Sequence, residues 1–131
     1  MLEIKERLKC MQNSVMKYVE RHLTSDLIIE SVIMTADYKT NNREMKKLRC
    51  LFDELSENME LMKEVYKILL DHENVVTRLH VSAECLRAGI FIKESVKNLE
   101  EISKQKDIGI ISFNAEMTLK VWNGEFEGNT L

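Results

Sequence analysis

The sequence contains no proline, only four glycines, and no long uninterrupted run of apolar residues. Proline and glycine are the residues that most often interrupt regular structure, so their scarcity favours long helices joined by short loops. No segment bounded by turn residues alternates apolar and polar positions as a half-buried strand does. A membrane span requires about 20 consecutive apolar residues, so we expect no contact with a membrane. These absences favour an all-helical protein.

Cysteine is also rare, and the three cysteines lie far apart at Cys10, Cys50 and Cys85. Neither a disulfide framework nor a metal knuckle fits this odd number and spacing. The segment Met1–Lys9 interleaves charged and apolar residues, as an amphipathic helix does and a secretory signal does not. The sequence therefore predicts reduced thiols and a cytoplasmic location.

With 131 residues, the chain is long enough for one domain with its own core, and we expect a single all-helical domain over residues 1–131. The net charge of −3 is too small to select a class of partner. The charge is uneven, however, because residues 39–49 are mainly basic and residues 50–74 mainly acidic. Two solvated helix faces would explain this pattern. A dipolar surface that orients a charged protein partner is the alternative.

About seven helices follow from the spacing of apolar residues and from cap residues. Thr24 or Ser25 is expected to begin the second helix, and Asp37 either begins the third or lies in a bend. Asn58 is expected to begin the fourth, and Gly89 to end the fifth in a left-handed conformation. The first helix is expected over residues 2–22, and the second carries its apolar residues over 27–36. The third carries its apolar residues over 45–55, and the fourth ends at residues 71–72. The last three are expected over residues 74–88, 92–104 and 108–123. The tail 125–131 is expected to be frayed, with Phe126 folded back.

Two helix pairs, residues 59–89 and 92–123, resemble each other. At an offset of 32 residues, Leu70 aligns with Ile102, and Ala83 and Glu84 align with Ala115 and Glu116. The first helix of each pair aligns at 31, so the turn needs one inserted residue. Self-similarity of this period is typical of stacked helical repeats. The two alanines are expected to mark close contacts between helices.

No catalytic or metal-binding motif is recognisable. His22, His72 and His80 do not lie one helical turn from another histidine or cysteine, and no phosphate-binding loop or nucleophile elbow is present. His22 and His72 are expected to interact with the last carbonyls of their helices. We therefore expect no enzyme activity, no cofactor and no metal.

A stripe of polar residues follows the second helix of each predicted pair, and we call it the polar ridge. It comprises His80, Glu84, Arg87, Ser112, Glu116 and Lys120. The remaining faces of the two helices are apolar, through Val81 and Cys85 on one and Ile110, Phe113, Met117 and Val121 on the other. Helices that are apolar over most of their circumference are flanked on several sides, so only the ridge is expected to reach water. In a solenoid such stripes line a binding surface, and mixed charges suit a protein partner.

The large apolar residues at helical spacing are otherwise interpreted as core. Met11, Met45, Met62 and Met117 lie on apolar stripes, so they are expected to fill the interior rather than form a binding groove. Trp122 is expected to close the last apolar face as a terminal plug.

Two stretches resemble a known family. Residues 36–43 (Ala-Asp-Tyr-Lys-Thr-Asn-Asn-Arg), followed by Lys46-Lys47-Leu48, resemble a segment of a small bacterial domain family of unknown function with HEAT-like helical repeats. Residues 113–122, followed by Gly124, are similar to its C-terminal signature. The resemblance implies a HEAT-like α-solenoid. It also implies a function, because some proteins of this type are immunity proteins that bind and block a partner toxin.

Three classes of function follow. The preferred hypothesis is a non-catalytic protein-binding module, and most concretely an immunity protein that neutralises a cognate bacterial toxin encoded by an adjacent gene. A HEAT-like protein associated with nucleic acid is the alternative, but it requires a coherent basic face, and the acidic stretch 50–74 argues against one. An enzyme without a recognisable motif is the second alternative. The sequence does not indicate an oligomeric state.

Overall fold

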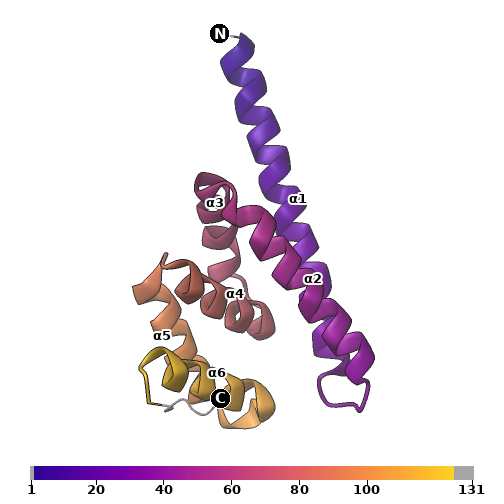
Figure 1. Cartoon of the computed structure of the whole chain (residues 1–131), viewed down its shortest axis with the longest axis vertical. Coiled ribbons are helices and arrows are strands. Elements are labelled where there is room, and N and C mark those ends of the chain that lie inside the picture. Colours follow the sequence, from indigo (N-terminus) through magenta and orange to yellow (C-terminus); the bar gives the residue numbers. More distant parts are fainter. Residues whose placement is uncertain (1, 126–131) are drawn as a thin grey trace. The chain divides into compact units, whose positions relative to one another are not determined.

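The computed structural model describes residues 2–125, and for Leu2, Leu8 and Met11 it describes the backbone only. The described chain is helical throughout and divides into two compact units, unit 1 (residues 1–71) and unit 2 (residues 72–131). Figure 1 follows the helices from α1 to α6. Unit 1 holds α1 (Leu2–Val32), α2 (Tyr38–Ser56) and α3 (Met59–Leu70). Unit 2 holds α4 (Val75–Ala88), α5 (Ile92–Ser103), a 3₁₀ turn η1 (Lys106–Ile108) and α6 (Ile110–Trp122).

Helix α1 is continuous over 31 residues, so the predicted break at Thr24 or Ser25 is wrong. The hydroxyl of Thr24 donates to the carbonyl of Glu20 one turn earlier, 2.8 Å away, instead of capping a new helix. Ser25 is buried and donates to Glu44 on α2. Both candidate cap residues therefore form bonds that leave the helix intact, and the first two predicted helices are one helix, which ends at Val32.

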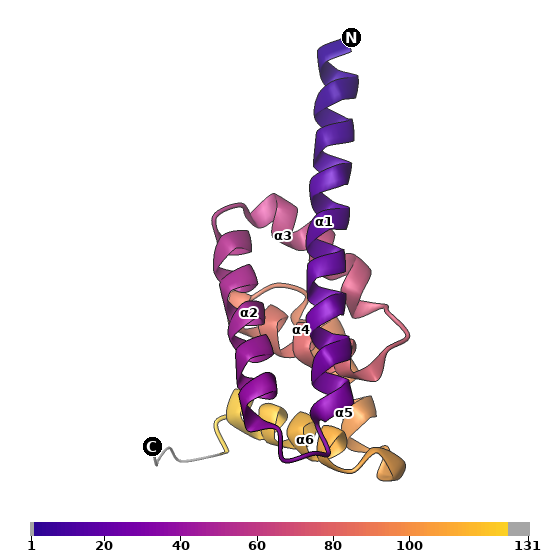
Figure 2. The same ribbon diagram turned by 90° about the vertical axis from the view of Figure 1, so that its right-hand side faces the viewer.

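The chain reverses between α1 and α2, at the position where the sequence offered two alternatives. Asp37 is the N-cap of α2, and its carboxylate accepts a hydrogen bond of 3.0 Å from the backbone N–H of Thr40. The two helices then run side by side, and the N-terminal turns of α1 extend beyond α2 (Figure 2).

Helix α3 completes unit 1 by packing on both α1 and α2. Its N-cap is Asn58, as predicted, which accepts a hydrogen bond from the N–H of Leu61. Leu48 and Leu55 are buried as expected, whereas Met45 is exposed and the buried α2 residue beside them is Leu51. The buried apolar side chains of unit 1 are Val15, Val19, Ile29, Leu48, Leu51, Leu55, Met62, Val65, Tyr66, Leu69 and Leu70.

Unit 2 begins with a helical hairpin. Asn74 caps α4 by accepting from the N–H of Thr77, and Gly89 ends the helix with a left-handed φ of 74°, as predicted. Phe91 is also left-handed, with φ of 46°, and its carbonyl begins α5 by accepting from the N–H of Ser95. Two left-handed residues within three positions reverse the chain tightly, so α4 and α5 pack along each other.

Helix α6 packs on α5 and, less extensively, on α4. It begins after the 3₁₀ turn and Gly109, about two residues later than predicted. It ends in a Schellman motif, in which the N–H of Glu125 bonds to the carbonyl of Lys120 and that of Gly124 to Val121. Of the tail that was expected to be frayed, only Glu125 is described, and Phe126 lies outside the described residues. The side chain of Met11 is not described either, so its place in the core stays a prediction.

The all-α prediction is confirmed for the described residues, which form six α-helices where about seven were expected. The HEAT-like solenoid and the single domain stay predictions. The boundary between the two units falls after Asp71, so the helices of the first predicted pair, α3 and α4, belong to different units.

Candidate functional site

A groove in unit 2 lies between α4 and α6 and has a volume of about 480 Å³. Its residues come from the last two turns of α4 and from the part of α6 that begins at Asn114. They are Ala83, Leu86, Arg87, Asn114, Met117, Thr118, Val121 and Trp122. Apolar side chains thus share the groove with one guanidinium, one amide and one hydroxyl, a composition typical of sites that bury an apolar group and orient it with a few polar contacts.

The face of α6 around this groove is apolar and exposed. Phe113 is 55% exposed, Val121 65% and Trp122 43%, and Ile110 is exposed as well. The predictions that this face is buried and that Trp122 closes the core are wrong, because α5 and α4 cover only the side of α6 that carries Ile111 and Ala115. Tryptophan and arginine are both enriched among the residues that contribute most to the stability of protein interfaces.

The α4 residues of the polar ridge have three different environments. Arg87 is exposed and lines the groove. His80 is half-buried and lies outside it. Glu84 is only 8% exposed, so the expectation that its carboxylate reaches water is wrong.

The α6 residues of the ridge lie beside the groove rather than in it. Glu116 and Lys120 are one turn apart, with 3.4 Å between the Nζ of Lys120 and a carboxylate oxygen of Glu116. Ser112 is half-buried and donates to the carbonyl of Gly109, 2.8 Å away. Of the six predicted residues, the structure therefore brings only Arg87 into the groove.

The aligned residues of the predicted repeat do not share one environment. Leu79 and Ile111 are both buried, as the alignment requires. Ala115 is fully buried, but its counterpart Ala83 is half-buried and lines the groove. Glu84 and Glu116 differ in the same way, because Glu116 is exposed. Of these three aligned pairs, only Leu79 with Ile111 agrees in burial, whereas Ala83 with Ala115 and Glu84 with Glu116 differ.

Sequence reasoning missed most of the groove. Asn114 and Thr118, one turn apart on α6, were not identified, and Met117, Val121 and Trp122 were interpreted as core. A usable signal existed, since a helix that is apolar on nearly every face must either be enclosed or present apolar surface for a partner.

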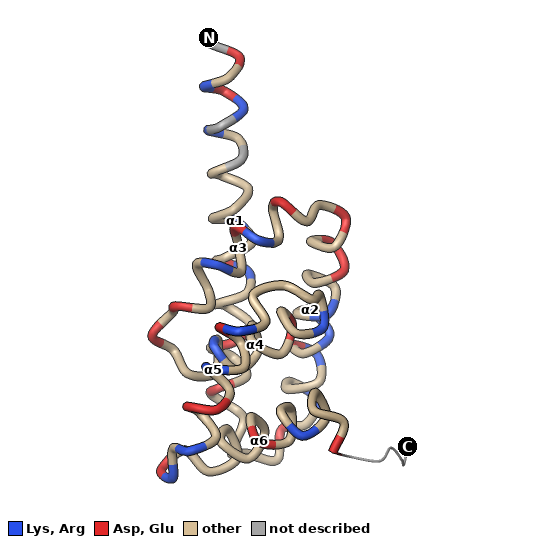
Figure 3. Tube along the Cα trace, turned by 90° about the vertical axis from the view of Figure 1, so that its left-hand side faces the viewer, with Lys and Arg blue, Asp and Glu red and all other residues tan. Residues whose placement is uncertain are grey.

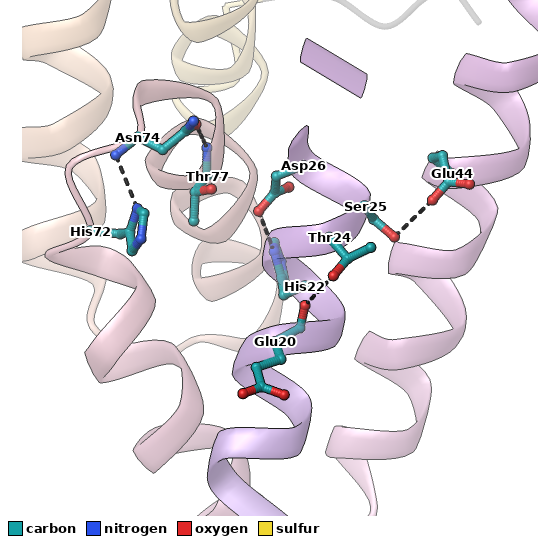
Figure 4. A network of polar contacts seen from close by, with 9 residues as sticks. All are labelled: Glu20, His22, Thr24, Ser25, Asp26, Glu44, His72, Asn74 and Thr77. Atoms are coloured by element: carbon teal, nitrogen blue, oxygen red, sulfur yellow. Dashed lines mark hydrogen bonds and ion pairs between the residues drawn. The ribbon is translucent and has the colours of Figure 1, made fainter. Parts of the chain in front are cut away.

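A second polar group is buried in unit 1, and Figure 4 shows it from close by. His22 and Asp26 are both fully buried, and the His22 Nδ1 lies 2.7 Å from the Asp26 Oδ2. The ring of His22 meets that of Tyr66 on α3 edge-on, with 6.2 Å between centroids. The prediction that His22 ends a helix is wrong, because α1 continues past it and directs its side chain into the interior.

Glu44 on α2 is also a buried carboxylate of unit 1, and its bonding partners lie on both α1 and α2. One of its oxygens accepts from Ser25 at 3.0 Å, and the other lies 3.0 Å from the Nζ of Lys47 and 3.4 Å from the Nε of Arg43. Burial alone raises the pKa of a carboxyl group, but these hydrogen bonds outweigh burial, so the pKa of Glu44 is lowered. Nearby, Arg21 holds Glu54 with two hydrogen bonds, which lower the pKa of Glu54.

His72, in unit 2, has a local structural role. Its Nδ1 accepts a hydrogen bond of 3.0 Å from the backbone N–H of Asn74, rather than the ring bonding to the last carbonyls of a helix (Figure 4). The guanidinium of Arg78 donates to the carbonyls of His72 and Glu73. These contacts fix the turn that leads into α4.

The three cysteines differ in their exposure to solvent. Cys10 and Cys50 are exposed, whereas burial raises the pKa of the Cys85 thiol to about 12. In the described part of the chain, histidine, cysteine and acidic side chains nowhere gather in threes around a point that suits a metal ion. None of the helices described is both long and apolar enough to cross a membrane.

Comparisons with known proteins assign no role to these sites. The chain matches no family model, no curated protein and no solved structure.

Proposed function

We propose that this chain is a non-catalytic protein-binding module and that the groove between α4 and α6 receives an apolar side chain of the partner. The observation that carries the proposal is the exposed apolar face of α6 beside Arg87. Water-exposed apolar surface of this kind costs free energy that a partner recovers by covering it. Arginine and tryptophan are enriched among the residues whose truncation weakens protein complexes most.

The polar residues beside the groove add orientation to this apolar contact. Arg87 adds a positive charge at the groove, which suits an acidic group on the partner. Asn114 and Thr118 provide further hydrogen-bonding groups along the same groove. Because all these side chains are carried by packed helices, ordering them on binding costs little conformational entropy.

The most concrete form of the proposal is an immunity protein that binds and neutralises a bacterial toxin. The resemblance of residues 36–48 and 113–124 to the HEAT-like family supports this form. The partner would then be the product of an adjacent gene. Of the polar ridge, Glu116 and Lys120 are retained as peripheral contacts, whereas Glu84 is too buried to be one.

The test is a binding titration against the purified product of the neighbouring gene. Replacing Arg87 and Trp122 together with Ala should weaken the complex by at least about tenfold, the usual loss for central interface residues. Ile92→Ala with Lys93→Ala is the matched control, since it removes one exposed apolar and one exposed cationic side chain from α5.

The control should bind like the wild type, and circular dichroism should show both variants folded. A folded Arg87→Ala, Trp122→Ala protein that binds at wild-type strength would place the interface elsewhere. The acidic stretch 50–74 would then be the next candidate.

A further inference from the structure

A second groove, in unit 1, differs in chemistry from the groove of unit 2. It lies between α1 and α2, has a volume of about 610 Å³, and is lined by ten residues. They are Glu20, Arg21, Thr24, Ser25, Arg43, Glu44, Lys46, Lys47, Cys50 and Leu51. Cations outnumber carboxylates among them, although the net charge of the whole chain is negative.

The four cations of this groove are not equivalent. Arg21 is committed to Glu54, which takes a hydrogen bond from each of its Nη groups at 3.1 and 2.7 Å. Arg43 uses its Nε toward Glu44, and that contact leaves its two Nη groups unused. Lys46 is exposed and forms no ion pair with Glu44 or with another described residue.

Glu44 fixes the positions of the cations around it. Glu44 is only 1% exposed, and its carboxylate accepts a hydrogen bond from Ser25 of α1. The carboxylate is therefore held in place while the exposed side chains that contact it can move. Arg43 and Lys47, each with a 60% exposed side chain, converge on one of its oxygens from either side. One buried negative charge thus orients two cations toward the same part of the groove, and it neutralises only one of them.

From this geometry we infer that the groove of unit 1 binds a carboxylate group presented by an acidic peptide segment. The Nη groups of Arg43 form a fork that matches the two oxygens of a carboxylate. Lys46, three residues along the same helix, supplies a second positive charge beside that fork. The buried pair of Glu44 with Ser25 holds the floor of the site in place.

The surroundings favour a peptide over a nucleic acid. Acidic residues gather at the C-terminal end of α2, beyond the basic ones (Figure 3). Glu20 also lines the groove on the α1 side. These carboxylates repel an extended phosphate backbone, which needs a continuous basic track, whereas a peptide can place a single acidic side chain between them.

The test uses the full chain and a peptide with a single Glu among Gly and Ser residues, carrying an uncharged fluorophore, followed by fluorescence anisotropy at low salt. Replacing both Arg43 and Lys46 with Gln should weaken binding about tenfold or more, the loss expected for a charge-assisted hydrogen bond. Lys47 remains to pair with Glu44, so the fold should persist. Lys46→Gln alone provides a second variant, because Lys46 makes no contact with Glu44, and it should weaken binding in the same direction.

The control removes the same charge elsewhere, through Lys93→Gln with Lys97→Gln on α5. Equal weakening by this control would show attraction to net charge only and would overturn the proposal. Failure of the wild type to bind the peptide at low salt would overturn it as well. Short duplex DNA is the competing probe, and tighter binding of DNA than of peptide, lost in the Arg43→Gln, Lys46→Gln variant, would assign the groove to nucleic acid instead. None of these outcomes involves the groove of unit 2, so the proposed function is tested separately.

Discussion

His22 and Asp26 form a hydrogen-bonded pair one helical turn apart on α1, with 2.7 Å between Nδ1 and Oδ2 and no exposed surface on either side chain. A buried carboxylate is tolerated in a protein interior only when it has partners. Each member of the pair therefore needs the other as a partner in the interior of unit 1.

Replacing His22 with Leu should destabilise the protein by about 3–5 kcal/mol, because it leaves the Asp26 carboxylate buried without this partner. The double variant His22→Leu, Asp26→Leu should recover part of that loss, since apolar residues of similar volume can replace a buried pair at little cost. Urea unfolding of the two variants gives the comparison. A double variant no more stable than His22→Leu would contradict this account.

The stability of the protein should fall in acid through Glu44. The folded-state pKa of Glu44 is lowered, so its contribution is fully present above the ordinary pKa of a glutamate and is lost as the pH falls through the folded-state value. The Glu44→Gln variant should therefore be less stable than the wild type at neutral pH, and this difference should shrink in acid. Urea unfolding at neutral pH and at about pH 3 measures both differences. A penalty that does not change with pH would show that Glu44 acts through shape alone.

Ala115→Leu should destabilise the protein by about 1–3 kcal/mol, because Ala115 is fully buried between packed helices. Ala83→Leu should cost clearly less, since the added atoms can extend into the groove that Ala83 lines. Thermal melts of the two variants test this difference directly. Equal losses would mean that Ala83 is as tightly packed as its predicted repeat counterpart.

The three thiols should differ in reactivity. Cys10 and Cys50 are exposed and should react readily with iodoacetamide at neutral pH. Cys85 is buried, and burial raises its pKa to about 12, so almost none of it is thiolate at that pH. Mass spectrometry should find Cys85 unmodified in the folded protein and modified in urea. Rapid labelling of Cys85 without urea would imply that unit 2 opens easily.

The basic side chains of α2 should bind duplex DNA only non-specifically. Lys39, Arg43, Lys46 and Lys47 are largely solvated, and Glu44 partly neutralises two of them. Affinity should be weaker than about 1 μM at physiological salt and should fall steeply as salt rises. Sub-micromolar binding that disappears when the four residues become Ala would favour the nucleic-acid alternative over protein binding.

Local signals in the sequence were sufficient to locate most helix ends. Asn58 begins its helix and Gly89 ends its helix as predicted, because capping involves atoms only a few residues apart. The helix break that was wrongly predicted at Ser25 results from a contact that is not local. Its hydroxyl bonds to Glu44, which lies 19 residues away on another helix, and no local pattern contains that information.

The candidate site was harder to predict than the fold. Helical spacing groups His80, Glu84 and Arg87 on one side of α4, but spacing does not say how far a neighbouring helix covers that side. Glu84 was expected in water and is buried, and Val121 was expected in the core and is exposed. Both errors come from tertiary packing, which decides exposure after the helices have formed.

The continuity of α1 has a consequence for how stability is distributed along it. At a rise of 1.5 Å per residue, its 31 residues span about 46 Å. Its second half contributes Val19, His22, Asp26 and Ile29 to the interior, while residues 3–7 are exposed on every side. A short stretch of helix without tertiary contacts is only marginally stable in water. The second half of α1 should therefore open only when unit 1 unfolds, whereas its N-terminal turns can fray one after another. The amide protons of α1 should become steadily less protected from hydrogen exchange toward the N-terminus.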